Sequence, residues 1–238
     1  MSTCKTIAMI PARMGSQRLK QKNLRELAGV PLIVRAIRKC QATGLFDEIW
    51  VNSEHAAFGE IAEAEGARFH QRPAELGSNS ATSEQFVHEF LTAHDCEYLF
   101  QVHSIAPLLT ARQVGDFVQF TLQADADVVL SYIPEQIECA LEGEPVNFTF
   151  HEKTNSQELS PIQRITWSIT AWRRASYLAA FESGRCATYA GRVDLFPVDR
   201  ISGHVIKTEE DLQLAEALLP LVEQGECSHE GGNQTRAA

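Results

Sequence analysis

The 238-residue sequence lacks the cysteine pairs that mark disulfide frameworks and zinc sites. Its six cysteines are dispersed without a Cys-x-x-Cys pair, so we expect reduced thiols with no metal or disulfide role. Long apolar runs are also missing, and none approaches the length that spans a bilayer. Since no signal-peptide pattern precedes the first apolar run, a cytoplasmic location is the default expectation.

Basic residues are few for a chain of this size. The sequence has 21 Lys and Arg against 31 Asp and Glu, which gives a formal net charge of −10. Because nucleic-acid binding generally needs an extended basic face, this balance argues against nucleic acid as a partner. The glycines of standard nucleotide-binding loops are also absent: Gly15 lacks the partner glycines of a dinucleotide fingerprint, and no Gly-Lys-Ser/Thr follows it.

One stretch of the sequence combines a short apolar run with a cluster of cations. Residues 7–10 are apolar and are followed by Pro11, which predicts a buried parallel strand. Residues 13–25 contain no acidic side chain, and their cations are Arg13, Arg18, Lys20, Lys22 and Arg25. Such a loop after a strand, with a glycine and a serine that allow close backbone approach, suits a polyphosphate at the carboxyl end of a sheet. A solvated basic loop is the alternative.

The rest of the chain alternates short apolar strands with amphipathic helices. We expect further strands at residues 47–53, 98–102, 127–133, 165–172, 193–198 and 204–206. We expect helices at residues 32–40, 56–66, 83–94, 111–122, 176–183 and 209–223, the third capped by Thr82 or Ser83 and the fourth by Thr110. Repeated βα units predict an α/β fold, with a mainly parallel sheet covered by helices on both faces.

The alternation stops between residues 134 and 166, where polar residues, glycine and proline dominate. More than about 20 unstructured residues inside a compact domain are unusual, so we expect an excursion with a docking role rather than a plain loop. The predicted organisation is one domain over residues 1–224 that contains this excursion, followed by a disordered tail over residues 225–238.

Two motifs resemble those of a known family. Ile10-Pro-Ala-Arg-x-Gly-Ser-x-Arg-Leu-x-x-Lys-Asn23, followed by Leu27-x-Gly-x-Pro-Leu-Ile33, resembles the opening of the CMP-sugar-acid synthetases, the cytidylyltransferases that activate sialic acids and their relatives. Gln71-Arg-Pro-Ala-Glu-Leu, continuing to Ser83, resembles their cytosine-reading segment. The resemblance covers most of residues 5–220. It implies a Rossmann-like nucleotidyltransferase domain, with the excursion as the dimerisation arm of a homodimer.

The resemblance also implies roles for individual residues. The nucleotide-binding candidates are Arg13, Ser16, Arg18, Lys22, Asn23, Arg72, Ala81 and Ser83. Within this set, Arg13 and Lys22 are the catalytic candidates, since nucleotidyl transfer mainly needs positioning and neutralisation of phosphate charge. Taken alone, Asn23 would be a turn residue, Arg72 a surface residue and Ser83 a helix cap.

The acceptor region departs from the family pattern. A third block, residues 99–108, keeps Gln101 but has two extra residues and a new His103; we take both side chains as candidates for acceptor binding. A lone histidine at a strand end is as readily a structural hydrogen-bonding group. Ser156 replaces a family arginine, and Thr166-Trp167 replaces the usual Asn-Gly, so the acceptor stays open.

The metal site departs further. Relatives carry Asp-Ile-Asp before Thr-x-x-Asp-Leu, and these two aspartates hold Mg²⁺; here Val205 and Lys207 stand in their places. A hard divalent cation needs oxygen donors, so the Mg²⁺ expected from the family has lost its usual ligands. The ammonium of Lys207 is a possible metal substitute, and a solvent-facing lysine is the alternative. Asp211 persists, with helix-dipole complementation as its simplest role.

Three functions remain open from the sequence. The favoured one is transfer of CMP from CTP to an acidic sugar, a sialic-acid-like 2-keto acid, with release of pyrophosphate. The first alternative is a catalytically impaired nucleotide-binding relative with a regulatory or assembly role, and the second is CMP transfer to a phosphonate or another unusual acid. The expected partners are CTP, an acidic small molecule and a second copy of the chain, with no nucleic acid and no membrane. The sequence names no general base.

Overall fold

The computed structural model describes residues 5–232, and the side chains of residues 5–225. Its main sheet has seven strands in the order β11-β7-β10-β6-β1-β4-β5. They are β1 (Thr6–Pro11), β4 (Glu48–Ser53), β5 (Arg68–Gln71), β6 (Tyr98–Val102), β7 (Val128–Glu135), β10 (Ile162–Arg173) and β11 (Val193–Pro197). In this sheet β10 runs antiparallel to β6 and β7, whereas the other neighbouring pairs are parallel. The predicted mainly parallel sheet is therefore confirmed.

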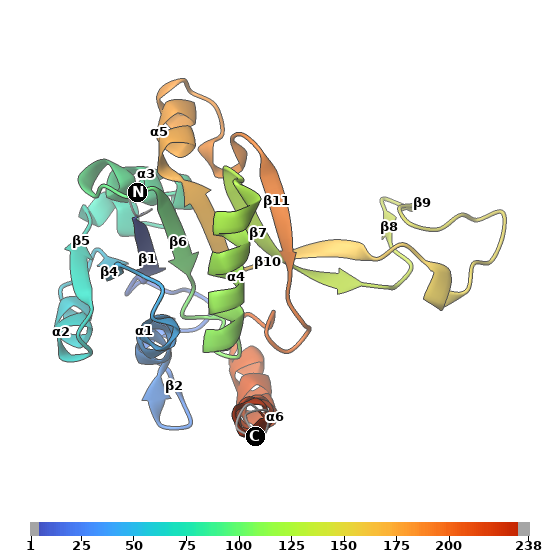
Figure 1. The fold of residues 1–238 in the computed structure, drawn as a ribbon, viewed down its shortest axis with the longest axis horizontal. Helices are drawn as coiled ribbons and strands as arrows, with labels where there is room; N and C mark the ends of the chain where they lie inside the picture. Colours follow the sequence, from blue (N-terminus) through green and yellow to red (C-terminus); the bar gives the residue numbers. More distant parts are fainter. Residues whose placement is uncertain (1–4, 233–238) are drawn as a thin grey trace, which may run out of the picture.

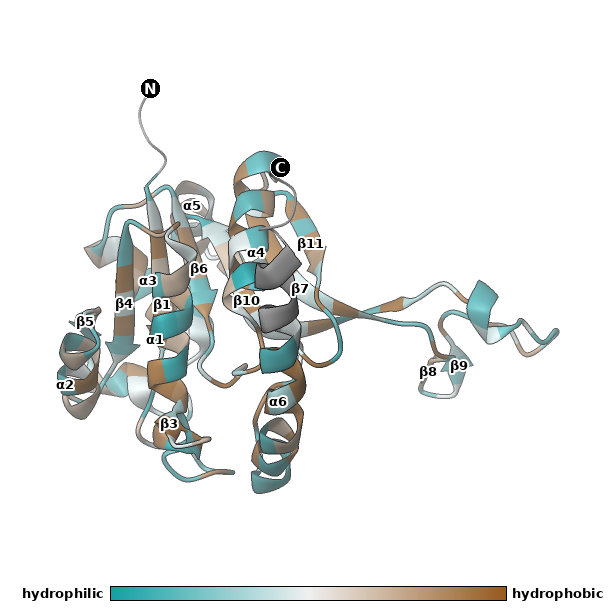
Figure 2. Ribbon diagram, turned by 60° about the horizontal axis from the view of Figure 1, so that its bottom comes forward, coloured by the Kyte–Doolittle hydropathy of each residue, from teal (hydrophilic) through white to brown (hydrophobic). Residues whose placement is uncertain are grey.

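Helices cover both faces of this sheet (Figure 1). They are α1 (Leu32–Thr43), α2 (Ala57–Ala64), α3 (Ser83–Ala93), α4 (Ala111–Ala124), α5 (Arg174–Glu182) and α6 (Glu209–Gly232). Alternate residues of β1 separate two cores: Ala8 and Ile10 pack with α1, α2 and α4, whereas Ile7 and Met9 pack with α3 and α5. The helices carry both teal and brown segments in Figure 2, as amphipathic helices do. No helix among residues 5–232 is long and apolar enough to cross a membrane.

Sequence signals explain where several helices begin. Thr82 and Thr110 cap α3 and α4, each in a capping box with a glutamine three residues later. Pro31 precedes α1, and Gly44 ends that helix in a left-handed conformation at φ 62°. Short elements connect the larger ones: η1 (Lys22–Leu24), β2 (Glu26–Leu27), β3 (Val30–Pro31), η2 (Ala74–Gly77) and η4 (Ala187–Tyr189).

The structure corrects two predictions and adds one strand. Residues 204–206 form no strand; the N–H of Ile206 instead donates to the carbonyl of Ile105 at 2.8 Å, which ties this loop to the loop after β6. Helix α6 continues to Gly232, so residues 225–232 are helical where a disordered tail was expected. The remainder of that tail, residues 233–238, lies outside the described residues. The edge strand β5 was not predicted, because its four residues alternate too briefly to show a period.

The excursion between residues 134 and 166 is a structured arm. The ends of β7 and β10 pair beyond the sheet as a two-stranded ribbon, and the arm holds β8 (Ala140–Leu141), β9 (Glu144–Pro145) and η3 (Ser156–Glu158). Figure 1 shows this arm projecting away from the layered domain. Its exposed apolar side chains are Ile137, Leu141, Val146 and Phe150. The predicted dimer contact of this arm stays a prediction.

Candidate nucleotide site

A cavity of about 250 Å³ lies at the carboxyl ends of β1 and β6. Its walls come from the loop after β1, from η1, from the loop after β6, from α3 and from the loop before α6. The charged side chains that line it are Arg13, Arg18, Lys22, Arg72 and Lys207. No carboxylate belongs to the described lining, so the cavity gathers positive charge in a chain that is acidic overall.

The positive charge of the cavity affects the pKa of Lys22. Burial and the nearby cations Arg18, Arg13 and Lys207 together lower the pKa of Lys22 to about 8, and burial contributes most. A lysine in such surroundings is stabilised when a polyanion enters and supplies the missing counter-charge. The arrangement therefore suits the phosphates of a nucleotide.

Asn23 connects the basic loop to the end of β6. Its amide nitrogen donates to the carbonyl of Arg13 at 3.1 Å, and its amide oxygen accepts from the hydroxyl of Ser104 at 2.8 Å. The side chain is buried. Asn23 therefore holds the loop in shape, and its predicted role in binding the nucleotide stays a prediction.

Arg72 is a buried clamp between strand ends, so the alternative of a surface arginine is wrong. Its guanidinium donates to the carbonyl of Ala12 at 2.9 Å, to Asn52 Oδ1 at 3.0 Å and to Glu54 Oε2 at 3.1 Å. It also lies over the ring of Phe86, 4.7 Å from its centroid. Arg72 Nε is buried and has no hydrogen-bond partner among the described residues.

Two predicted cytosine-reading residues lie outside the cavity lining. The N–H of Ala81 donates to Ser78 Oγ at 3.2 Å, and Ser83 is the exposed first residue of α3. Arg13 reaches toward this segment, because its guanidinium donates to Asn79 Oδ1 at 3.1 Å. The predicted residues that do line the cavity are Arg13, Ser16, Arg18, Lys22, Asn23, Arg72, His103 and Lys207.

Gln101 and His103 lie at the end of β6. The side-chain amide of Gln101 is buried and contacts His103 Nε2, while Gln101 Oε1 has no partner among the described residues. The backbone N–H of His103 donates to the carbonyl of Ser168 on β10 at 3.1 Å. Burial lowers the pKa of His103 to about 4, with a further contribution from Lys22, so the ring is neutral at neutral pH.

A bulge in β10 lies beside this end of β6. The pairing with β7 shifts register between Ile165 and Thr170, and Trp167 has a left-handed backbone at φ 60°. The hydroxyl of Thr166 bonds to that of Ser131 at 2.9 Å and to that of Ser168 at 2.6 Å. A bulky residue in this conformation is unusual, and strain of this kind concentrates at functional sites.

The residues at the family's metal position do not fit a protein-held Mg²⁺. Val205 offers no oxygen from its side chain, and Lys207 brings a cation to the cavity wall. The neighbouring Asp211 uses one carboxylate oxygen to accept from Lys207 N at 2.8 Å and from Thr208 N at 2.9 Å, as a residue at a helix start does. No group of three His, Cys, Asp or Glu side chains that could hold a metal occurs among the described residues.

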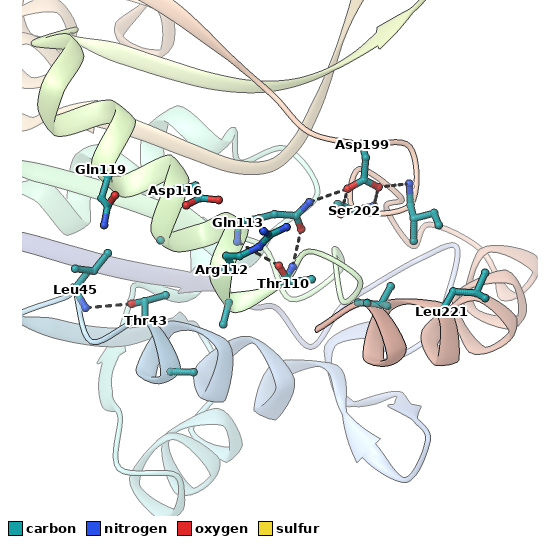
Figure 3. A pocket seen from close by; sticks show the side chains of 16 residues that line it. Thr43, Leu45, Thr110, Arg112, Gln113, Asp116, Gln119, Asp199, Ser202 and Leu221 are labelled. Carbon is teal, nitrogen blue, oxygen red and sulfur yellow. Dashed lines mark hydrogen bonds between the residues drawn. The ribbon is translucent and has the colours of Figure 1, made fainter. Parts of the chain in front are cut away.

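A larger cavity of about 1010 Å³ lies elsewhere, between the end of α1, the start of α4 and α6 (Figure 3). None of the predicted site residues lines it. The carboxylate of Asp199 there accepts from Gln113 Nε2 at 2.7 Å, from two backbone N–H groups and from the hydroxyl of Ser202. These polar groups satisfy one another, so this cavity has fewer features of a phosphate site than the smaller one.

The sequence did not single out several residues that build the site. Asn52 and Glu54 hold Arg72, Phe86 lies under its guanidinium, and Ser104 holds Asn23. The sequence did contain a pattern that could have identified Asn52 and Glu54. Polar residues at the carboxyl end of a predicted parallel strand lie at the same sheet edge as the basic loop.

Comparison with known proteins shows the family of this chain. The family model for cytidylyltransferases matches residues 7–217. The chain belongs to the cytidylyltransferase family. The chain is 37% identical over 139 residues to an N-acylneuraminate cytidylyltransferase of Escherichia coli O18:K1:H7, covering 56% of this chain and 33% of the relative.

Two further comparisons show how far the similarity extends. It is 31% identical over 127 residues to N-acylneuraminate cytidylyltransferase A of Danio rerio, covering 53% of this chain and 30% of that protein. Such matches span only about a third of these curated relatives. The structure of a CMP:2-keto-3-deoxy-manno-octonic acid synthetase complexed with CTP matches with a TM-score of 0.70 at 17% identity, covering 91% of this chain and 99% of that one. This likeness supports the nucleotidyltransferase fold.

Proposed function

We propose that this cytidylyltransferase transfers CMP from CTP to a sugar acid, a sialic-acid-like 2-keto acid, and releases pyrophosphate. The observation that carries the proposal is the cavity whose charged lining is made entirely of cations, in a chain of net charge −10. Each charge-assisted contact to a phosphate contributes roughly 1.5–3 kcal/mol. Several together are enough to hold a triphosphate.

The roles of the residues follow from what nucleotidyl transfer requires. The acceptor oxygen attacks the α-phosphorus while pyrophosphate leaves, and the protein must align these groups and neutralise developing charge. Arg13, Arg18 and Lys22 neutralise the phosphates. The unpartnered Nε of Arg72 meets a carbonyl of the base, which favours a pyrimidine with an acceptor at that position.

Lys207 substitutes for part of the metal charge in this proposal. It lines the cavity and is one of the cations that lower the pKa of Lys22. At an effective dielectric near 20, an ammonium about 4 Å from a phosphate oxygen gains on the order of 4 kcal/mol before desolvation is subtracted. One positive charge then stands where relatives place a divalent ion.

The acceptor binds beside the β10 bulge and the end of β6. Gln101 lies there, on the strand that pairs with β10, and the bulge holds Trp167 and the hydroxyl cluster of Ser131, Thr166 and Ser168. Two similar proteins are named for N-acylneuraminate and 2-keto-3-deoxy-manno-octonic acid, and both compounds are 2-keto sugar acids. These acids are therefore the first probes.

The test measures pyrophosphate released from CTP with N-acetylneuraminate, 2-keto-3-deoxy-manno-octonate or a set of phosphonates. Release that requires a sugar acid, with a CMP ester detected by mass spectrometry, supports the proposal. Release with phosphonates alone changes the acceptor class. CTP binding without release from any acid overturns the enzymatic proposal and favours a nucleotide-binding regulatory subunit, the candidate suggested by the missing metal ligands.

We also propose that the arm at residues 134–166 packs against a second copy of the chain. It projects from the domain and exposes large apolar side chains, among them Leu141 at 70% and Phe150 at 69% exposure. Side chains of this size gain about 1.5–3 kcal/mol each on full burial. In a homodimer, the second copy would bury these side chains.

A further inference from the structure

His103 differs from every other titratable side chain that lines the cavity. The other described titratable groups of the lining are Arg13, Arg18, Lys22, Arg72 and Lys207. At pH 7 these are mainly cations, and a protonated amine or a guanidinium has no lone pair to accept a proton. His103 is neutral there, because burial and Lys22 disfavour its charged form. Among the described lining residues, His103 is therefore the side chain that is mainly in a proton-accepting form at pH 7.

We propose that His103 accepts the proton of the attacking hydroxyl when CMP is transferred. This inference rests on the proposed function. It assigns a catalytic residue to a reaction for which the sequence named no base. The assignment depends on three observations: His103 lines the cavity, it lies among cations that hold the phosphates, and the described lining contains no carboxylate that could take the proton instead.

The contacts of the ring indicate which nitrogen takes the proton. Nε2 contacts the side-chain amide of Gln101, and Nδ1 has no hydrogen-bond partner among the described residues. If the amide of Gln101 is turned so that its oxygen faces the ring, Oε1 accepts from Nε2–H and is no longer without a partner. That tautomer places the lone pair on Nδ1. Gln101 is then a positioning residue that fixes the ring.

Hydrogen bonds on both sides fix the main chain of His103. His103 N donates to the carbonyl of Ser168, and the carbonyl of His103 accepts from Ala106 N at 3.2 Å. The described groups recorded as acting on the ring are Lys22 from η1 and the Gln101 amide from β6. Neither of them is acidic. The surroundings therefore keep the imidazole neutral until a triphosphate brings negative charge, which raises its proton affinity when it is needed.

The chemical step balances without a further reactant. The acceptor O–H bond breaks as its proton moves to His103 Nδ1, and the oxygen forms a bond to the α-phosphorus. The bond from that phosphorus to the bridging oxygen of the β-phosphate breaks, and its electron pair leaves with pyrophosphate. Arg13, Arg18 and Lys22 stabilise the leaving charge, and the imidazolium later loses its proton to water.

The first test is independent of turnover. Nitrogen-15 NMR of the histidine rings, with His103 assigned from the spectrum of His103→Gln, reports which ring nitrogen carries the hydrogen. We expect Nε2 protonated and Nδ1 unprotonated at pH 7. A hydrogen on Nδ1 would leave that nitrogen unable to accept a proton and would overturn the proposal.

The second test measures single-turnover formation of the CMP ester, with the sugar acid that gives most pyrophosphate release. We expect His103→Gln to slow the chemical step by about 10²-fold or more and to remove the acid limb of the pH–rate profile, while CTP affinity changes less than threefold. Gln101→Glu should move the acid limb of the otherwise wild-type enzyme to higher pH, because a carboxylate raises the proton affinity of the ring. His88→Gln, on α3 and stacked on Phe181, is the matched control and should keep the wild-type rate.

The outcomes separate this inference from the proposed function. Wild-type turnover with an unchanged rate and profile in His103→Gln overturns the base assignment and leaves cytidylyl transfer standing. CTP binding without turnover from any acid overturns the proposed function, and the base assignment falls with it. A slower His103→Gln that keeps the wild-type acid limb shows a structural histidine and also overturns the assignment.

Discussion

Arg72 is expected to be the residue on which the shape of the nucleotide site depends most. Its side chain is 3% exposed and joins Ala12, Asn52 and Glu54 at the ends of three neighbouring parallel strands. We predict that Arg72→Met, which keeps much of the volume but no donor, destabilises the fold strongly. The change leaves two neutral acceptors and one carboxylate without their guanidinium partner.

The size of the effect follows from these contacts. Removing one member of a buried ion pair typically costs about 3–5 kcal/mol, because the remaining charge is left uncompensated. For a chain of this length, each kcal/mol lowers Tm by roughly 2–4 °C. We therefore expect Tm to fall by about 6–20 °C. Adding Glu54→Gln to Arg72→Met should recover part of the lost stability, because a neutral amide then replaces the unpaired carboxylate.

The assay compares urea unfolding of Arg72→Met with that of Arg68→Met. Arg68 lies on β5, four residues before Arg72, and pairs with Glu48 at 3.2 Å, but its side chain is 61% exposed. Exposed pairs contribute about 0–1 kcal/mol, so the control should change stability little. If the two variants differ by less than about 1 kcal/mol, the buried clamp is not a major source of stability and our reasoning about Arg72 is wrong.

Three further predictions concern charge and assembly. CTP affinity should weaken as the pH rises from 7 to 9, because Lys22, with a pKa of about 8, is increasingly uncharged and must take up a proton when CTP binds. Calorimetry at pH 8 in buffers of different ionisation enthalpy should show this proton uptake, and its absence would contradict the prediction. Lys207→Ala should weaken metal-free CTP binding about tenfold, roughly 1.4 kcal/mol, whereas the control Lys20→Ala, in the same basic region but outside the lining, should not. Equal effects of the two variants would refute the metal-substitute role of Lys207. The double variant Val205→Asp with Lys207→Asp should make CTP binding depend on Mg²⁺. Scattering should show a dimer at micromolar concentration through residues 134–166, and a monomer would exclude it.

Local signals in the sequence predicted most of the layered fold. The apolar run at residues 7–10 became β1, and Thr110 caps α4 with Gln113 completing its capping box. These features depend on nearby residues, so a single sequence reveals them. The edge strand β5 depends instead on pairing with β4, which the sequence of its four residues does not show.

Part of the candidate site could likewise be predicted from neighbouring residues, and part could not. The basic loop was visible because Arg13, Arg18 and Lys22 are close in sequence. The burial of Arg72 and its contacts with Asn52 and Glu54 join residues about 20 positions apart, and no local pattern reports them. Sequence reasoning also could not tell which side chains line the cavity, and here Ala81 and Ser83 lie outside it.

Nucleotide selectivity tests the central claim most directly. Calorimetric titration of the protein with CTP, UTP and ATP, at one pH and one salt concentration, measures whether the cavity reads cytosine or only binds triphosphates. The proposed function predicts the tightest binding for CTP, because a mismatched base leaves buried groups unpaired. Equal affinities for the three nucleotides would contradict a cytidylyl-transfer site.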